Sequence, residues 1–124
     1  MNIVDSSGWL AYFADEINAK HFMVPLSSPS TLIVPAITLY EVFKVILRES
    51  SENEALQAVV AMQKGEVIHL NTSLAPAAAR LSLEHRLPMA DSIILATAQE
   101  FRATIWTQDA DFKDLSKVKY FPKK

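Results

Sequence analysis

The sequence predicts an α/β fold in which a parallel sheet of about five strands is flanked by helices. Short apolar runs alternate along the chain with longer segments that carry apolar residues at helical spacing. The short runs are apolar throughout, which is typical of strands buried on both faces of a parallel sheet. The 124 residues match one domain with its own core, so we expect a single domain spanning residues 1–124.

The strands can be placed from the apolar runs. The first begins at Asn2 and ends at Asp5, and the others follow at intervals that leave room for helices. The expected strands are residues 2–5, 31–35, 67–70, 104–107 and 118–121.

The helices are placed from apolar spacing and from capping residues. Ser6 or Ser7 is expected to cap a first helix that carries Trp9, Leu10, Phe13 and Ile17 on one face. Four further helices are expected at residues 37–48, 52–64, 73–85 and 90–102. The last is apolar nearly all round, so it should be buried. Residues 27–30, Ser-Ser-Pro-Ser, predict a surface loop.

The composition limits the class of protein. There is no cysteine, which excludes disulfides, thiolate zinc sites and cysteine nucleophiles. The first residues contain neither a basic region nor a long apolar run, so neither a signal peptide nor a membrane span is expected and a cytoplasmic protein is the default. Half of the residues are hydrophobic, which favours an apolar oligomer face, and we expect a dimer.

Four acidic residues are expected to meet at one edge of the sheet. Asp5 ends the first strand, Glu41 lies in the helix after the second, Asp91 lies near the start of a buried helix, and Asp109 follows the fourth strand. Parallel strands all end at the same edge, so these side chains can share a crevice. Clustered carboxylates repel one another unless a divalent cation lies between them. The pattern therefore predicts a metal site.

Each acid also has a simpler interpretation. Asp5 fits a strand end or helix cap, Glu41 can lie on a solvated helix face with Lys44 and Arg48, and Asp91 favours the helix dipole. Only the combination of positions points to function. Setting these four aside leaves 10 of 14 acidic residues against 12 basic ones, a charge distribution that suits a metal site beside a phosphate backbone.

Other common sites are not supported. His21, His69 and His85 lack metal-ligand spacing, and no Gly-x-Ser-x-Gly motif is present. The two glycines are too few for a P-loop or a dinucleotide-binding fingerprint. The lysines near the C-terminus, Lys117, Lys119, Lys123 and Lys124, can be solvated or can contact a phosphate backbone.

The ordered motifs resemble those of PIN-domain ribonucleases, and in particular the VapC-type toxins of toxin–antitoxin pairs. The similar segments are residues 3–7 (Ile-Val-Asp-Ser-Ser), 40–42 (Tyr-Glu-Val), 87–96 and 107–112 (Thr-Gln-Asp-Ala-Asp-Phe). They cover almost the whole chain in order. Two departures stand out: Gln108 occupies a position where many relatives carry a basic residue, and Val42 one where leucine is frequent.

The resemblance implies a PIN-like, three-layer α/β/α fold, Mg²⁺ or Mn²⁺ bound by Asp5, Glu41, Asp91 and Asp109, and cleavage of RNA. It also implies dimerisation and inhibition by a small cognate antitoxin whose tail occupies the groove. Ser6, Thr107 and Asp111 are candidates for supporting roles around the metal, and Asp111 is the alternative to Asp109 as the fourth ligand. A bound cation would lower the pKa of a water and orient it for in-line attack on a phosphodiester.

Three alternatives stay open. A phosphoacceptor receiver domain would place an aspartate after the third strand, where His69, Leu70 and Asn71 stand; a dehalogenase-like phosphatase would need an acid at Ser7. A catalytically inactive PIN-like scaffold that binds RNA or protein is the remaining alternative. It would gain nothing from holding mutually repelling carboxylates together.

Overall fold

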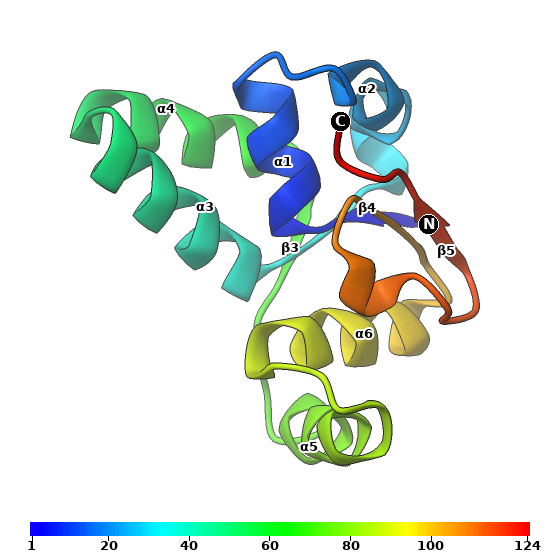
Figure 1. Cartoon of the computed structure of the whole chain (residues 1–124). Helices are drawn as coiled ribbons and strands as arrows, with labels where there is room; N and C mark the ends of the chain where they lie inside the picture. The colour runs from blue at the N-terminus through cyan, green and yellow to red at the C-terminus, as the bar shows by residue number, and fades with distance from the viewer.

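The computed structural model describes residues 1–124 and contains six α-helices, five strands and two short 3-10 helices (Figure 1). The strands are β1 (Asn2–Val4), β2 (Ile33–Pro35), β3 (Glu66–Ile68), β4 (Thr104–Thr107) and β5 (Val118–Tyr120). The helices are α1 (Ser6–Phe13), α2 (Ala19–Leu26), α3 (Ala36–Glu49), α4 (Glu52–Met62), α5 (Leu74–His85) and α6 (Met89–Phe101). The 3-10 helices are η1 (Pro29–Thr31) and η2 (Ala110–Phe112).

All strand pairs are parallel. One ladder has the order β1-β4-β5 and a second pairs β2 with β3. A single parallel bridge between Asn2 and Leu32 links β1 to the segment that leads into β2. The expected parallel sheet is therefore confirmed, but its hydrogen bonding is divided into two ladders.

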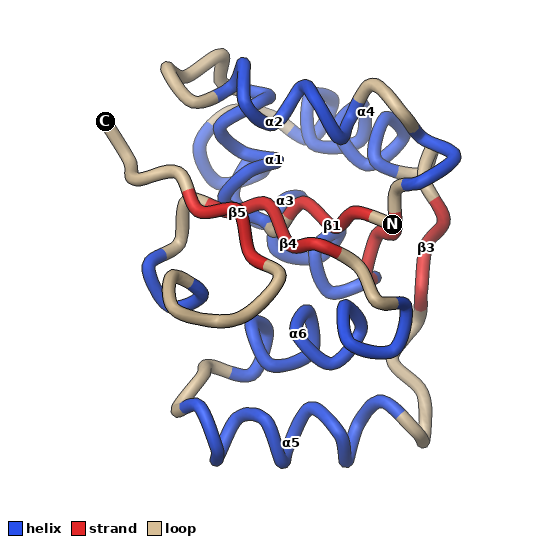
Figure 2. The backbone as a smooth tube through the Cα atoms, turned by 90° about the vertical axis from the view of Figure 1, so that its right-hand side faces the viewer, coloured by secondary structure: helices blue, strands red, loops and turns tan.

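Successive strand residues face opposite layers. Ile3, Ile33 and Ile105 belong to a core shared with α5 and α6, whereas their neighbours Val4 and Val34 belong to a core shared with α1, α2, α3 and α4. This follows from the two-residue period of a strand. Figure 2 shows α5 and α6 together on one side of the sheet and α1, α2 and α4 on the other, which is the expected three-layer arrangement.

The elements match the sequence expectations to within a few residues, with three corrections. Asp5 itself is the N-cap of α1, because its Oδ1 accepts a hydrogen bond from the Gly8 N–H at 3.0 Å; the expected cap at Ser6 or Ser7 was wrong. Helix α1 ends at Phe13, so Ile17 lies beyond it and is 62% exposed. Helix α2 was not expected, since Pro25 lies inside its last turn.

Helix α6 is buried as predicted: every residue from Ser92 to Ala98 lies in the interior. Its burial fixes the start of the helix, and thereby Asp91, against the sheet. None of the helices combines the length and the apolar character needed to cross a bilayer.

Candidate active site and metal centre

The carboxyl ends of β1 and β4 place two of the predicted acids side by side. These strands are parallel neighbours, with Val4 opposite Trp106. Asp5 follows β1 directly, and Asp109 lies two residues beyond the end of β4. The observed register therefore explains why Asp5 and Asp109 lie close together at the strand ends.

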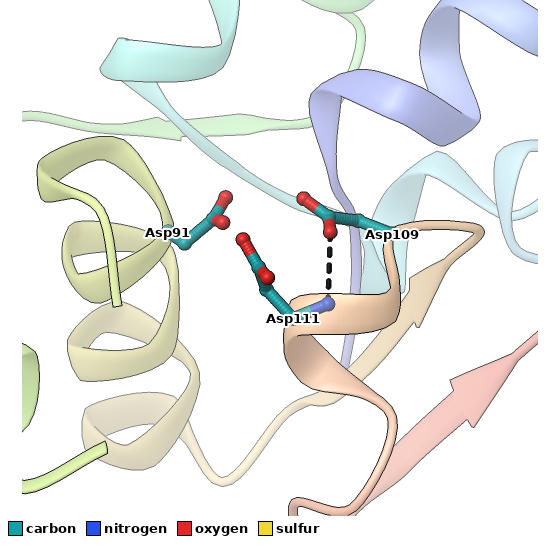
Figure 3. Close-up of side chains that lie close together, drawn as sticks. All are labelled: Asp91, Asp109 and Asp111. Atoms are coloured by element: carbon teal, nitrogen blue, oxygen red, sulfur yellow. Dashed lines mark hydrogen bonds between the residues drawn. The ribbon is translucent and has the colours of Figure 1, made fainter. Parts of the chain in front are cut away.

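A cluster of three carboxylates lies at this edge. Asp91 comes from the first turn of α6, and Asp109 and Asp111 come from the segment after β4. One carboxylate oxygen from each lies within 4.8 Å of the others. Figure 3 shows the three side chains pointing toward one another. Asp111, the lesser candidate from the sequence, thus belongs to the cluster together with Asp109.

The side chain of Asp109 also has a structural role. Its Oδ1 accepts a hydrogen bond from the backbone N–H of Asp111 at 2.9 Å (Figure 3). This contact caps the 3-10 helix η2. The capping bond fixes the Asp109 carboxylate relative to the backbone of Asp111.

Asp5 is almost fully buried, at 2% exposure. Its pKa is raised to about 6, mainly by burial and to a smaller extent by the negative charge of Asp109. Three donors oppose this shift by stabilising the carboxylate: the Thr107 hydroxyl at 2.6 Å, the Ser7 hydroxyl at 2.7 Å and the Gly8 N–H. These contacts hold Asp5 in one orientation.

Asp91 is the most perturbed group of the site. Its pKa is raised to about 8, first by partial burial and then by the negative charges of Asp109, Asp5 and Asp111. Asp5, Asp91 and Asp109 therefore share one electrostatic environment, although Asp5 is not part of the tight group of three. The chain's salt bridges, Arg48–Glu49 and His85–Glu84, involve none of these acids.

Glu41 lies on α3 and is oriented by Ser6. The Ser6 hydroxyl donates to its Oε1 at 2.5 Å. Since Ser6 follows Asp5 in the chain, this contact ties Glu41 to the end of β1, but Glu41 is outside the group of three carboxylates. Ser6 and Thr107, both expected to support the site, donate to the carboxylates of Glu41 and Asp5.

Thr107 bridges two acids. While its hydroxyl donates to Asp5, its Oγ1 accepts the backbone N–H of Asp109 at 2.8 Å. Two further polar residues next to the acids were not expected to support the site. Ser7 donates to Asp5 and accepts the Gln108 backbone N–H at 3.2 Å, and the Gln108 side chain is buried. The sequence could have pointed to Ser7 and Gln108, because both are polar and lie close to predicted acids in the chain.

The donor set suits a hard divalent cation. All ligand candidates are carboxylate oxygens, which Mg²⁺ and Mn²⁺ prefer over sulfur or nitrogen ligands. Burial and mutual repulsion raise the pKa values of Asp5 and Asp91, so their charged forms are costly without a cation. A cation bound among them would relieve that repulsion.

The match to known families agrees with this geometry. Residues 3–118 match the PIN domain family model. The chain belongs to the PIN-domain family. No curated protein matches this PIN domain in sequence.

Solved structures share the PIN fold over nearly the full chain. A chain of a toxin–antitoxin complex from Klebsiella pneumoniae matches with a TM-score of 0.82 and 23% identity, covering 98% of this chain and 99% of that one. VapC20 of Mycobacterium tuberculosis, a toxin that cleaves the sarcin-ricin loop, matches with a TM-score of 0.80 and 18% identity, covering 94% and 95%. A chain of DNA-bound VapBC from Salmonella typhimurium gives 0.74 and 14%, covering 98% of each. These similarities establish the fold.

Proposed function

We propose that this PIN-domain protein is a metal-dependent endoribonuclease and the toxin of a toxin–antitoxin pair. It would hydrolyse RNA phosphodiesters with Mg²⁺ or Mn²⁺ held by Asp5, Glu41, Asp91 and Asp109. The observation that carries the proposal is the carboxylate cluster at the ends of parallel strands. The toxins among the matched structures, one of which cleaves the sarcin-ricin loop, support RNA as the substrate.

The chain's own residues would prepare the site by fixing the carboxylates. Asp5 is held by three donors, and Thr107 connects it to the Asp109 backbone. Ser6 orients Glu41. A bound cation would polarise the phosphodiester and lower the pKa of the attacking water. Fixed carboxylates need no reorganisation when charge develops, which is the main way such sites accelerate a reaction.

The proposed antitoxin would bind in a groove whose lining reaches Ser7 and Gln108 but none of the acids of the site. The groove has a volume of about 870 Å³ and includes Ser7, which is hydrogen-bonded to Asp5. Its lining is apolar on α1, α3 and α4, at Leu10, Phe13, Val45, Ile46 and Ala58, and acidic at Glu16, Glu49 and Glu54. A segment with apolar and basic side chains would complement this surface.

Dimerisation stays a prediction. The exposed apolar side chains include Tyr40 and Leu47 on α3 and Met89 at the start of α6, at 59%, 45% and 70% exposure. They could supply part of an interface. Light scattering of the purified protein would measure the oligomeric state directly.

Cleavage of labelled RNA tests the function. The wild type should cut RNA with Mg²⁺ or Mn²⁺ and not in chelator, and Asp5→Asn and Asp91→Asn should both abolish cleavage while the circular-dichroism spectrum stays unchanged. Asp114→Asn is the matched control, because Asp114 is exposed and lies outside the cluster. Cleavage in chelator, or full activity in both site variants, would contradict the proposal.

The same assay separates the alternatives. Comparing Asp109→Asn with Asp111→Asn would show which of the two carboxylates the reaction requires. A wild type that cuts no RNA under any divalent cation, but binds RNA or a partner protein, would instead favour the inactive scaffold.

A further inference from the structure

Asn18 connects the C-terminal segment to the strand end beside the site. It lies just before α2 and is 3% exposed. Its Nδ2 donates to the Gln108 side chain at 3.0 Å, to the Pro122 carbonyl at 2.9 Å and, at a longer 3.4 Å, to the Phe121 carbonyl. Its Oδ1 is buried without a partner, which costs free energy. The Asn18 side chain is therefore held in place by the N–H donors of its amide.

The C-terminal segment is held from several sides. The Phe121 N–H donates to the Thr107 carbonyl at 2.8 Å, and its ring stacks on His21 with centroids 4.3 Å apart. Gln108, 6% exposed, accepts from Asn18 and donates its backbone N–H to Ser7. Residues 121 and 122 are thus fixed to the segment that carries Thr107 and Asp109.

This anchoring places two lysines around Gln108, which precedes Asp109 in the chain. Lys123 lines the groove that begins at Ser7. Lys123 and Lys124 together also line a smaller cavity of about 300 Å³ next to Asn18 and Gln108. Neither lysine forms a salt bridge.

The charges around these lysines are mixed. Glu16 lines both cavities, and Glu49 and Glu54 line the larger one. Glu49 and Glu54 belong to the junction of α3 and α4, whereas Figure 1 shows the C-terminus beside α1 and α2. The lysines therefore contribute the positive charge at the end of the groove next to Gln108.

We propose that Lys123 and Lys124 bind RNA phosphates that flank the cleavage site, and that Asn18 is the positioning residue that holds them there. This inference rests on the ribonuclease function proposed above. A site rich in carboxylates repels a polyanion, so cationic groups next to it are needed to hold the substrate. The Gln108 side chain cannot serve, because it is neutral and its amide is engaged inside the protein.

The double variant Lys123→Ala/Lys124→Ala tests the contact through kcat and KM on a labelled single-stranded RNA at several KCl concentrations and constant Mg²⁺. Each phosphate contact on a single strand contributes about 0.7 to the slope of log affinity against log salt. Two lost contacts should lower that slope by about 1.4 and raise KM roughly 25-fold at about 0.1 M salt. The value of kcat should stay unchanged.

The matched control is Lys64→Ala/Arg80→Ala. It removes the same charge from exposed residues that line neither cavity. The proposal is wrong if both double variants show the same KM and salt slope, or if the lysine variant loses kcat instead of KM. Loss of antitoxin binding with unchanged KM would assign the lysines to the partner protein and equally overturn it. In each of these cases the proposed ribonuclease function is still supported if Asp5→Asn abolishes cleavage.

Asn18→Asp tests the positioning role, because it keeps the shape of the side chain and removes its N–H donors. KM should rise and the salt slope should fall as in the lysine variant, with little further change when the substitutions are combined. Asn18→Ala provides a second variant if the aspartate prevents folding. A KM effect of either variant that is undiminished in the Lys123→Ala/Lys124→Ala background would exclude a role through the lysines.

Discussion

Raising the pH should destabilise the metal-free protein, and replacing Asp91 with asparagine should remove most of the effect. The pKa of Asp5 is raised to about 6 and that of Asp91 to about 8, from 3.8. A carboxyl group with a higher pKa in the folded protein binds its proton more tightly there. The folded state therefore loses stability as the pH rises from about 4 through the folded pKa.

The size of the effect follows from these pKa values. Between pH 5 and pH 8, Asp5 should cost about 1 kcal/mol of stability. Asp91 would cost about 4 kcal/mol, which screening by solvent reduces to roughly 2 kcal/mol because the group is only partly buried. The sum of about 3 kcal/mol corresponds to a fall in Tm of about 10 °C for a chain of this length.

Thermal unfolding in chelator at pH 5 to 8 measures this directly. For Asp91→Asn we expect a Tm at pH 8 about 4 °C or more above that of the wild type, after allowing for the lost interaction of Asp91 with the α6 dipole, about 0.5 kcal/mol. The Asp114→Asn control should follow the wild type, and added Mg²⁺ should flatten the wild-type curve.

Two results would refute this reasoning. A wild-type Tm that stays constant or rises between pH 5 and pH 8 would mean that the folded protein does not raise the pKa values of Asp5 and Asp91. An Asp91→Asn variant less stable than the wild type at pH 8 would mean that Asp91 contributes more through its contacts than it costs through its charge.

Two further substitutions test the support of the site. Gly8→Ala should destabilise the fold by about 2 kcal/mol in urea unfolding, because a Cβ there would lie 2.6 Å from Val4 Cγ1 and 2.8 Å from the Phe22 ring; unchanged stability would contradict the tight contact. Thr107→Val should cost about 1–3 kcal/mol and lower kcat, because it leaves a carboxylate oxygen of Asp5 and the Asp109 N–H without their partner. Thr107→Ser keeps the hydroxyl and should retain most activity, and equal losses in the two variants would argue against the hydrogen bonds.

Most of the fold could be predicted from the sequence because its signals are local. Apolar runs such as residues 104–107 identify buried strands, and the apolar residues of α6 require burial whatever surrounds them. Helix α2 was not predicted, because a proline such as Pro25 is unusual inside a helix. The division of the sheet into two ladders also depends on strand spacing, which no local pattern encodes.

The sequence by itself determined which acids could meet. Asp5 and Asp109 follow strands, and parallel strands end at a common edge, so their proximity is a consequence of topology. Only the tertiary structure decided how closely each acid approaches the others. The η2 turn brings Asp111 into the cluster, whereas Ser6 holds Glu41.

The contacts around Asn18 were even less predictable from the sequence than the distances between the acids. Nothing local to residue 18 indicates that its amide holds Gln108 and the backbone of Phe121 and Pro122. Such contacts join segments about a hundred residues apart, and they form only once the layers have packed around the sheet. The chemistry of the side chains was readable from the sequence, but their partners depended on the packing.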